Sequence, residues 1–208
     1  SGAHFFDQVK VQALKKEVSI PVQDGRGWVA WEAPEKGCAY AAGADVADLG
    51  DDYSVLAIYN STKRTQAFRY RARVGVDVFY RVCDEWCRKY NNALLAVERN
   101  KQGRAIILGL EEDCKYPNLY REKKGNRPVV LSSRVTNQEG FGKELVRSGW
   151  DTNRDSKVEI LNGFRFALQG NYEEDVHNFQ PSFRVQDSEM LEEALYFIEE
   201  GGKLGASS

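Results

Sequence analysis

Two acidic residues each close a short apolar run, and residues of this type in this position can bind a divalent cation. Asp45 lies near the end of the apolar run 39–46, and Glu98 directly follows the apolar run 93–97. In open α/β sheets, ligands bind beyond the carboxyl ends of the strands, where acids from two adjacent strands can share a metal ion. Carboxylate oxygens suit Mg²⁺ or Mn²⁺, and two such ions roughly 3.5–4 Å apart can activate a water and stabilise the leaving oxygen of a phosphodiester. The pair therefore predicts phosphodiester hydrolysis, with Asp45 and Glu98 as the catalytic, metal-binding carboxylates.

Several of these acids also have an ordinary explanation. Asp52 ends the polar turn 48–52, where a turn-capping aspartate and a metal contact are about equally good interpretations. Asp48 and Asp51 in the same turn are better explained as solvated turn residues. Asp45 and Glu98 can likewise serve hairpin solubility and helix capping, because acids that follow strands are common on protein surfaces. Residue types alone therefore leave the metal site open.

Basic residues that can contact nucleic acid gather in two places. An alternating strand pattern directs Arg69, Arg71 and Arg73 to one face, which suits phosphate contacts but is better explained as a solvated face or a protected sheet edge. A second group surrounds a turn and can grip DNA phosphates from a projecting hairpin. Lys157 faces either the site or the solvent. The members of the turn group are Arg121, Lys123, Lys124 and Arg127.

The elements that position these residues follow an α/β plan. Short turns make the first three long strands antiparallel, and the all-apolar run 93–97 is typical of a parallel strand buried on both faces. The order is then β-β-β-α-β-α, followed by an added hairpin and helices. The predicted elements are strands at 28–31, 39–46, 53–59 and 66–74, a helix between Gly75 and Asn91, strand 93–97, a helix after Asn100, two strands within 119–134, a helix after Thr152 or Asn153, and a last helix from Asp187 or Ser188 to Gly201.

Length and composition indicate one folded domain of 208 residues, in which 1–37 form a lead-in segment and 38–208 form the main unit. No apolar run approaches the roughly 20 residues that span a bilayer, so no membrane association is expected. A net charge of −2 argues against a generally basic coat protein but leaves room for a local basic face. The four cysteines favour reduced, largely buried thiols over a zinc site.

Four motifs, in order along residues 39–160, carry a resemblance to a known family. The first joins Gly43 and Asp45 to the turn and Asp52, and the second joins Glu98 and Asn100 to Gly103. The third is 118–120, and the fourth is 149–153 with Lys157. No single motif is specific, but their joint order and spacing resemble the nuclease domain of the tailed-bacteriophage large terminase, of the ribonuclease H-like superfamily.

This resemblance implies a ribonuclease H-like mixed sheet and two-metal cleavage of double-stranded concatemeric DNA during genome packaging. Asp45 and Glu98 would then bind two Mg²⁺ or Mn²⁺ ions, with Asp52 as a further contact. The implied partners are double-stranded DNA, the terminase ATPase domain, the small terminase subunit and the portal. The implied location is the cytoplasm of the host cell.

The sequence also departs from the family pattern. It has no Gly-x4-Gly-Lys-Ser/Thr phosphate loop, so this chain is not by itself the packaging ATPase. The family's third acidic motif, a histidine followed by paired aspartates, does not occur, and Asp175 and Asp187 are poor substitutes. We therefore expect the third metal ligand beyond Ser208 and a chain that is catalytically incomplete. Two alternatives stay open: a catalytically silent module that grips DNA and docks on the motor, and another ribonuclease H-like nuclease such as a Holliday-junction resolvase.

Overall fold

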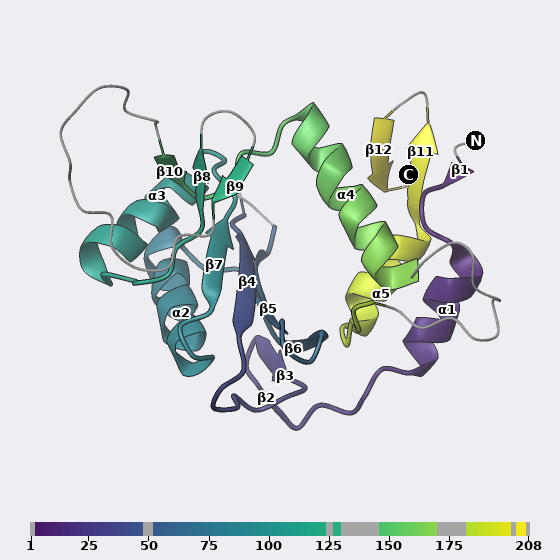
Figure 1. Cartoon of the computed structure of the whole chain (residues 1–208), viewed down its shortest axis with the longest axis horizontal. Coiled ribbons are helices and arrows are strands. Elements are labelled where there is room, and N and C mark those ends of the chain that lie inside the picture. Colours follow the sequence, from purple (N-terminus) through teal and green to yellow (C-terminus); the bar gives the residue numbers. More distant parts are fainter. Residues whose placement is uncertain are drawn as a thin grey trace.

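The structure is a computed structural model, and it describes residues 3–47, 52–123, 127–129, 146–169, 182–200 and 203–206. Within these ranges the strands form one six-stranded sheet and two three-stranded sheets. Figure 1 shows the large sheet in the middle, with helices on both sides of it. No helix of the described part is long and apolar enough to cross a membrane.

The six-stranded sheet has the order β2-β3-β6-β5-β4-β7. Neighbouring strands are antiparallel except β4 and β7, which are parallel. This confirms the predicted mixed sheet, with an antiparallel group of strands followed by a parallel one. The bounds are β2 (Gln23–Gly25), β3 (Trp28–Ala30), β4 (Tyr40–Asp45), β5 (Ser54–Asn60), β6 (Thr65–Ala72) and β7 (Leu94–Val97).

One face of this sheet is covered by α2 (Val76–Lys89) and by α3 (Gly103–Leu108), which continues into the π-helix η1 (Gly109–Asp113). The apolar positions of α2 recur at helical spacing, so one stripe of the helix can be buried. Phe79 and Cys83 from that stripe pack in the main core with Ala42 and Ala44 of β4. The even-numbered residues of β4 therefore face the helices, whereas Gly43 and Asp45 are exposed on the other face.

A second core lies on the other side of the sheet (Figure 1). It combines both ends of the described chain, because Phe6 and Val11 from the N-terminal part pack with Leu168 and Leu191. Strand β1 pairs with β11, which in turn pairs with β12. The elements of this lobe are β1 (Ala3–His4), α1 (Gln8–Lys16), α4 (Arg154–Gln169), α5 (Ser188–Leu195), β11 (Phe197–Glu200) and β12 (Lys203–Ala206).

The predicted added hairpin is present. Strands β8 (Arg121–Lys123) and β9 (Arg127–Val129) are antiparallel, and β10 (Val146–Ser148) pairs with the other edge of β8. A parallel bridge between Leu95 and Leu119 places the chain that enters this hairpin beside β7. The hairpin therefore extends from the β7 edge of the large sheet.

Two parts of the chain differ from the sequence-based description. Residues 3–37 contribute β2 and β3 to the large sheet and α1 to the second core, so within the described chain they are integrated into the fold. The predicted last helix is wrong at its end, because α5 stops at Leu195 and Phe197–Glu200 forms a strand. The backbone pairing of β11 with β1 and with β12 explains this switch. Aromatic and β-branched residues such as Phe197 and Ile198 also fit a strand well.

Candidate active site

Asp45 and Glu98 lie side by side at one edge of the large sheet. Strands β4 and β7 are parallel, and Ala44 is paired with Val97, so the next residue of each strand is Asp45 and Glu98. The Glu98 amide donates a hydrogen bond of 3.1 Å to the carbonyl oxygen of Ala44. Neighbouring strands are about 4.8 Å apart, and residues paired across them project to the same face. The two carboxylates therefore emerge together from the carboxyl ends of adjacent strands.

Both carboxylates belong to the face that α2 and α3 leave uncovered. Asp45 pairs with Val55, and Val55 pairs with Arg71, so these three residues form a row across β4, β5 and β6. The next row along the same face contains Gly43 and Arg69. The arginine stripe and the strand-end acids are therefore on one surface of the sheet.

Asp52 precedes β5, whose first residue, Ser54, lies beside the chain leaving β4. The Ser54 hydroxyl accepts a hydrogen bond of 3.2 Å from the Ala47 amide, and Asp52 itself is exposed. Asp52 is thus at the same edge of the sheet as Asp45, and its role as a metal contact stays a prediction. Asp48 and Asp51 lie outside the described residues.

The turn after β7 fixes the backbone of Glu98. Asn100 accepts a hydrogen bond of 2.8 Å from the Gly103 amide and donates one of 3.4 Å to the Val46 carbonyl, so it links the start of α3 to the end of β4. A β-carbon at position 103 would lie 1.7 Å from the carbonyl oxygen of Glu98, which only glycine avoids. The Asn100 side chain thus binds the first amide of α3, but the predicted N-cap is wrong in position, because Gln102 is the N-cap residue. Gly103 permits the close approach of helix and strand.

The glycine-tryptophan motif extends the sheet past β7. Trp150 forms a parallel bridge with Glu98, donating to the Val97 carbonyl at 2.8 Å and accepting from the Arg99 amide at 2.7 Å. Gly149 has a φ of +87°, and a β-carbon there would lie 2.7 Å from the Val97 carbonyl oxygen. The start of α4 consequently lies at the same edge as Glu98.

The first turn of α4 is capped as its sequence predicts. Asn153 accepts hydrogen bonds of 3.0 Å from the amides of Asp155 and Ser156. Lys157, one turn further on, is exposed on this helix. Its contact with DNA stays a prediction.

The arginine stripe holds the second lobe onto the sheet. Arg69 donates to both carboxylate oxygens of Asp187, at 2.9 and 3.0 Å, and to Glu189 at 2.9 Å. Arg71 donates to Glu189 at 3.1 Å. Asp187 also caps α5 through the amides of Glu189 and Met190, which matches its interpretation as an N-cap. These ion pairs give Arg69 and Arg71 a structural role, and their contact with DNA remains a prediction.

The basic hairpin is only partly described. Arg121 is exposed, and its guanidinium lies 3.9 Å from the Glu111 carboxylate. The backbone pairs Lys123 with Arg127 at the end of the hairpin, and Lys124 lies outside the described residues. The DNA-binding role of this group is not tested by these positions.

The carboxylates of Asp45 and Glu98 are the type of ligand that suits a divalent cation. Carboxylate oxygens from adjacent strands are the ligands that Mg²⁺ and Mn²⁺ prefer. The protein ligands are few, however. Within the described ranges, no group of three or more His, Cys, Asp or Glu residues is arranged to hold a metal ion. The role of Asp45 and Glu98 as metal ligands therefore stays a prediction.

One charged cluster beside the site was not found from the sequence. Arg99 follows Glu98, its side chain is only 9% exposed, and it forms ion pairs with Glu122 at 2.7 Å and with Asp151 at 2.6 Å. Its position next to a strand-end acid was the available signal. Both partners are distant in sequence, so the spacing of residues could not reveal them.

The sheet has the arrangement of a ribonuclease H-like fold. Strands β4, β5 and β6 are antiparallel, and the crossover helix α2 leads to β7, which is parallel to β4. Comparison with solved structures specifies this class further. The large terminase nuclease from thermophilic phage G20c with bound magnesium has a TM-score of 0.62 and 13% identity, covering 95% of this chain and 88% of that one. The same nuclease with bound cobalt has a TM-score of 0.62 and 13% identity, covering 98% and 88%. The Thermus phage P74-26 large terminase nuclease domain has a TM-score of 0.54 and 13% identity, covering 90% and 77%.

These neighbours confirm at the level of the fold the resemblance that the four motifs predicted. No protein-family model and no curated protein sequence matches the chain. At 13% identity the likeness establishes the shared fold, and the activity has to be argued from the residues of this chain.

Proposed function

We propose that this chain is the metal-dependent endonuclease domain of a viral terminase large subunit, which hydrolyses phosphodiester bonds of double-stranded DNA during genome packaging. The observation that carries the proposal is the side-by-side placement of Asp45 and Glu98 at the ends of β4 and β7. It occurs within a fold shared with large terminase nucleases. In open α/β sheets, ligands bind beyond the carboxyl ends of the strands, which is where these two acids lie.

In this proposal Asp45 and Glu98 hold two Mg²⁺ or Mn²⁺ ions, and the ions supply an activated water and stabilisation of the leaving oxygen. Both carboxylates project from strand ends that a backbone hydrogen bond from Glu98 to Ala44 joins. The Asn100 turn further fixes the end of β4 against the start of α3. Structures of the G20c nuclease that contain magnesium or cobalt support the use of a divalent ion.

DNA would approach the edge of the sheet where β4 and β7 end, with the basic hairpin beside it. Phosphate contacts from Arg121 and its basic neighbours hold DNA without reading its sequence, which suits an enzyme with little sequence preference. The proposed partners are DNA, the terminase ATPase domain, the small terminase subunit and the portal. The proposed location is the cytoplasm of the infected host.

The direct test is nicking of supercoiled plasmid by the purified chain in Mn²⁺, in Mg²⁺ and in EDTA. We expect nicking with Mn²⁺, slower nicking with Mg²⁺ and none with EDTA. Glu98→Gln is the matched control, because it preserves the shape of the side chain and removes its charge. Equal nicking by this variant and the parent would contradict the proposed site, and a preference for four-way junctions over linear duplex would favour a resolvase.

The small number of candidate metal ligands favours a second function. Within the described ranges no third metal-binding residue joins Asp45 and Glu98. A catalytically silent module that grips DNA and docks on the packaging motor would need only the basic surfaces. Under this alternative the chain binds duplex DNA, does not nick it in Mn²⁺, and binds it equally well as Glu98→Gln.

A further inference from the structure

The cluster around Arg99 joins three segments that surround the candidate site. Its guanidinium contacts Glu122 on β8 at 2.7 Å and Asp151, just before α4, at 2.6 Å. It also reaches the Ser148 carbonyl at the end of β10, at 3.5 Å. One side chain thus ties the end of β7 to the hairpin and to the start of α4.

The backbone around Arg99 is built to accept this side chain. The Arg99 amide donates to the Trp150 carbonyl at 2.7 Å, which aligns the two segments. A β-carbon on Gly149 would lie 2.9 Å from Cγ of Arg99, so the absence of a side chain there leaves room for the arginine stem. The arginine consequently crosses over the glycine to reach the hairpin.

The chemistry of the cluster explains why an arginine is needed. A buried charge is costly unless it is paired and hydrogen-bonded, and the Arg99 side chain is 9% exposed while that of Glu122 is 20% exposed. The planar guanidinium can serve two carboxylates and a carbonyl at once, whereas a lysine ammonium is a single point charge. Each partner therefore depends on the fork of Arg99 for its orientation.

The alternation of β8 connects this cluster to DNA binding. Successive side chains of a strand face opposite sides, so Glu122 faces Arg99 while Arg121 faces away from it. Arg121 is exposed and belongs to the basic hairpin. Anchoring Glu122 consequently sets the direction in which the hairpin presents Arg121.

We propose that Arg99 is a positioning residue that holds the basic hairpin in register with Glu98, so that DNA bound by the hairpin presents a phosphodiester to the strand-end acids. This inference rests on the proposed nuclease function. Arg99 itself touches neither metal nor DNA in this role. It acts through Glu122 and Asp151.

The test combines Arg99→Met with the hairpin variant that carries both Arg121→Ala and Lys123→Ala. We expect the hairpin variant to weaken duplex binding about tenfold at low salt through lost phosphate contacts. Arg99→Met should weaken binding to a similar extent and lower the nicking rate at saturating DNA. The Mn²⁺ concentration for half-maximal nicking should not change, because Asp45 and Glu98 are intact.

The decisive measurement is DNA binding by the chain that carries Arg99→Met together with the hairpin variant. Substitutions that act through one unit are non-additive, so adding the hairpin variant to Arg99→Met should weaken binding less than about twofold further. Arg99→Lys should recover part of the loss. Independent effects that multiply to about a hundredfold would overturn the proposal, as would full binding and nicking by Arg99→Met.

Two controls keep the outcomes separate. Arg88→Met removes another arginine that bridges segments, from Asp84 to the carbonyls of Cys114 and Lys115, and it should leave DNA binding and nicking unchanged. If Arg99→Met does not fold, Glu122→Gln takes its place under the same non-additivity criterion. A parent chain that neither binds nor nicks DNA would overturn the proposed function, whereas a working parent with additive variants would overturn only the role of Arg99.

Discussion

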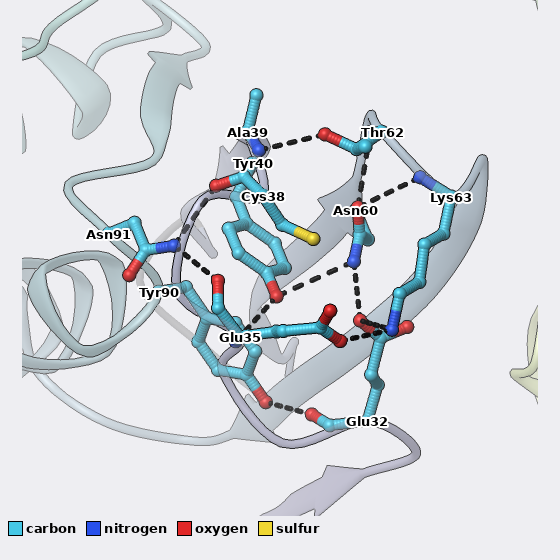
Figure 2. Close-up of polar contacts among 10 residues, drawn as sticks. All are labelled: Glu32, Glu35, Cys38, Ala39, Tyr40, Asn60, Thr62, Lys63, Tyr90 and Asn91. Atoms are coloured by element: carbon cyan, nitrogen blue, oxygen red, sulfur yellow. Dashed lines mark hydrogen bonds and ion pairs between the residues drawn. The ribbon is translucent and has the colours of Figure 1, made fainter.

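The polar side chains at the two ends of strand β4 differ in the contacts that they make. At its beginning, Tyr40 belongs to a closed network of hydrogen bonds and ion pairs, shown in Figure 2. At its end, Asp45 is exposed, and its neighbour Glu98 forms no ion pair with a described residue. We call the beginning of β4, with Tyr40, the closed end, and the end of β4, with the exposed Asp45 beside Glu98, the open end.

The closed end shows what a structural polar cluster requires. Asn60 is fully buried, accepts hydrogen bonds of 3.1 and 3.0 Å from the amides of Thr62 and Lys63, and donates to Glu32. Lys63 forms ion pairs with Glu32 and Glu35, so both carboxylates have a cation beside them (Figure 2). Buried polar groups of this kind are satisfied within the protein.

The comparison gives the open end its functional meaning. Two acids that serve the fold have a cationic partner, since Asp187 pairs with Arg69 and Glu35 pairs with Lys63. Glu98 has no such partner among the described residues, although it lies beside a second carboxylate. Neighbouring carboxylates repel each other unless a cation joins them. Binding of a divalent ion by these two carboxylates stays a prediction.

The largest expected effect is on catalysis at the open end. Asp45→Ala and Glu98→Ala should each lower Mn²⁺-dependent nicking by a factor on the order of 10²–10³, a scale typical of losing a group that stabilises charge in the transition state. Circular dichroism should show an intact fold for both variants, because neither carboxylate contributes to a core. Nicking at the parental rate by either variant would remove that residue from the site.

Metal binding should stabilise only the chain with an intact open end. Mn²⁺ at a hundred times its dissociation constant raises the free energy of unfolding by about 2.7 kcal/mol. Thermal unfolding should show this shift for the parent and not for Glu98→Ala. Without metal, Glu98→Ala should be slightly more stable than the parent, since one like-charge repulsion is gone. An equal Mn²⁺ shift in both proteins would place the ion elsewhere.

A substitution at the closed end should lower the stability of the fold and leave nicking unchanged. Asn60→Ala leaves the amides of Thr62 and Lys63 without their buried acceptor, and we expect the free energy of unfolding to fall by about 2 kcal/mol. Urea denaturation measures this loss. Nicking per folded molecule should equal that of the parent, and a selective loss of nicking would break the division between the two ends.

Replacing Lys123, Lys124 and Arg127 together with alanine should weaken DNA binding without altering either end of β4. Each lost phosphate contact lowers the slope of log affinity against log salt by about 0.9. Binding measured at several salt concentrations should therefore show a flatter dependence for duplexes of any sequence. A slope equal to the parental one would exclude the hairpin from the DNA interface.

The smallest effect is a pH response of the closed end. Burial raises the pKa of Tyr40 and of Tyr90 from the ordinary value of 10.0, because the neutral hydroxyl is favoured inside the fold. This stabilisation is fully present below pH 10.0 and is lost as the pH rises through the folded-state pKa. Stability should thus be insensitive to these groups at neutral pH, and tyrosinate absorbance should show their delayed ionisation in alkali.

The sequence by itself was enough for the central strands, two helix starts and the strand-end positions of Asp45 and Glu98. Alternation and apolar runs predicted the strands that became β4, β5, β6 and β7, and the side chains of Asn153 and Asp187 marked helix starts correctly. Asp45 and Glu98 were recognisable because a carboxylate after an apolar strand is a local signal. These features depend on residues close together in the chain.

Tertiary structure decided what those elements contact. Arg69 and its partner Asp187 are 118 positions apart, and Arg99 and Glu122 are 23 apart, so no local pattern could pair them. The end of α5 became a strand because β1, from the other end of the chain, supplies its backbone partners. Local sequence determines dihedral preferences and which face of an element is apolar, whereas partners brought together by the fold determine which charges are neutralised.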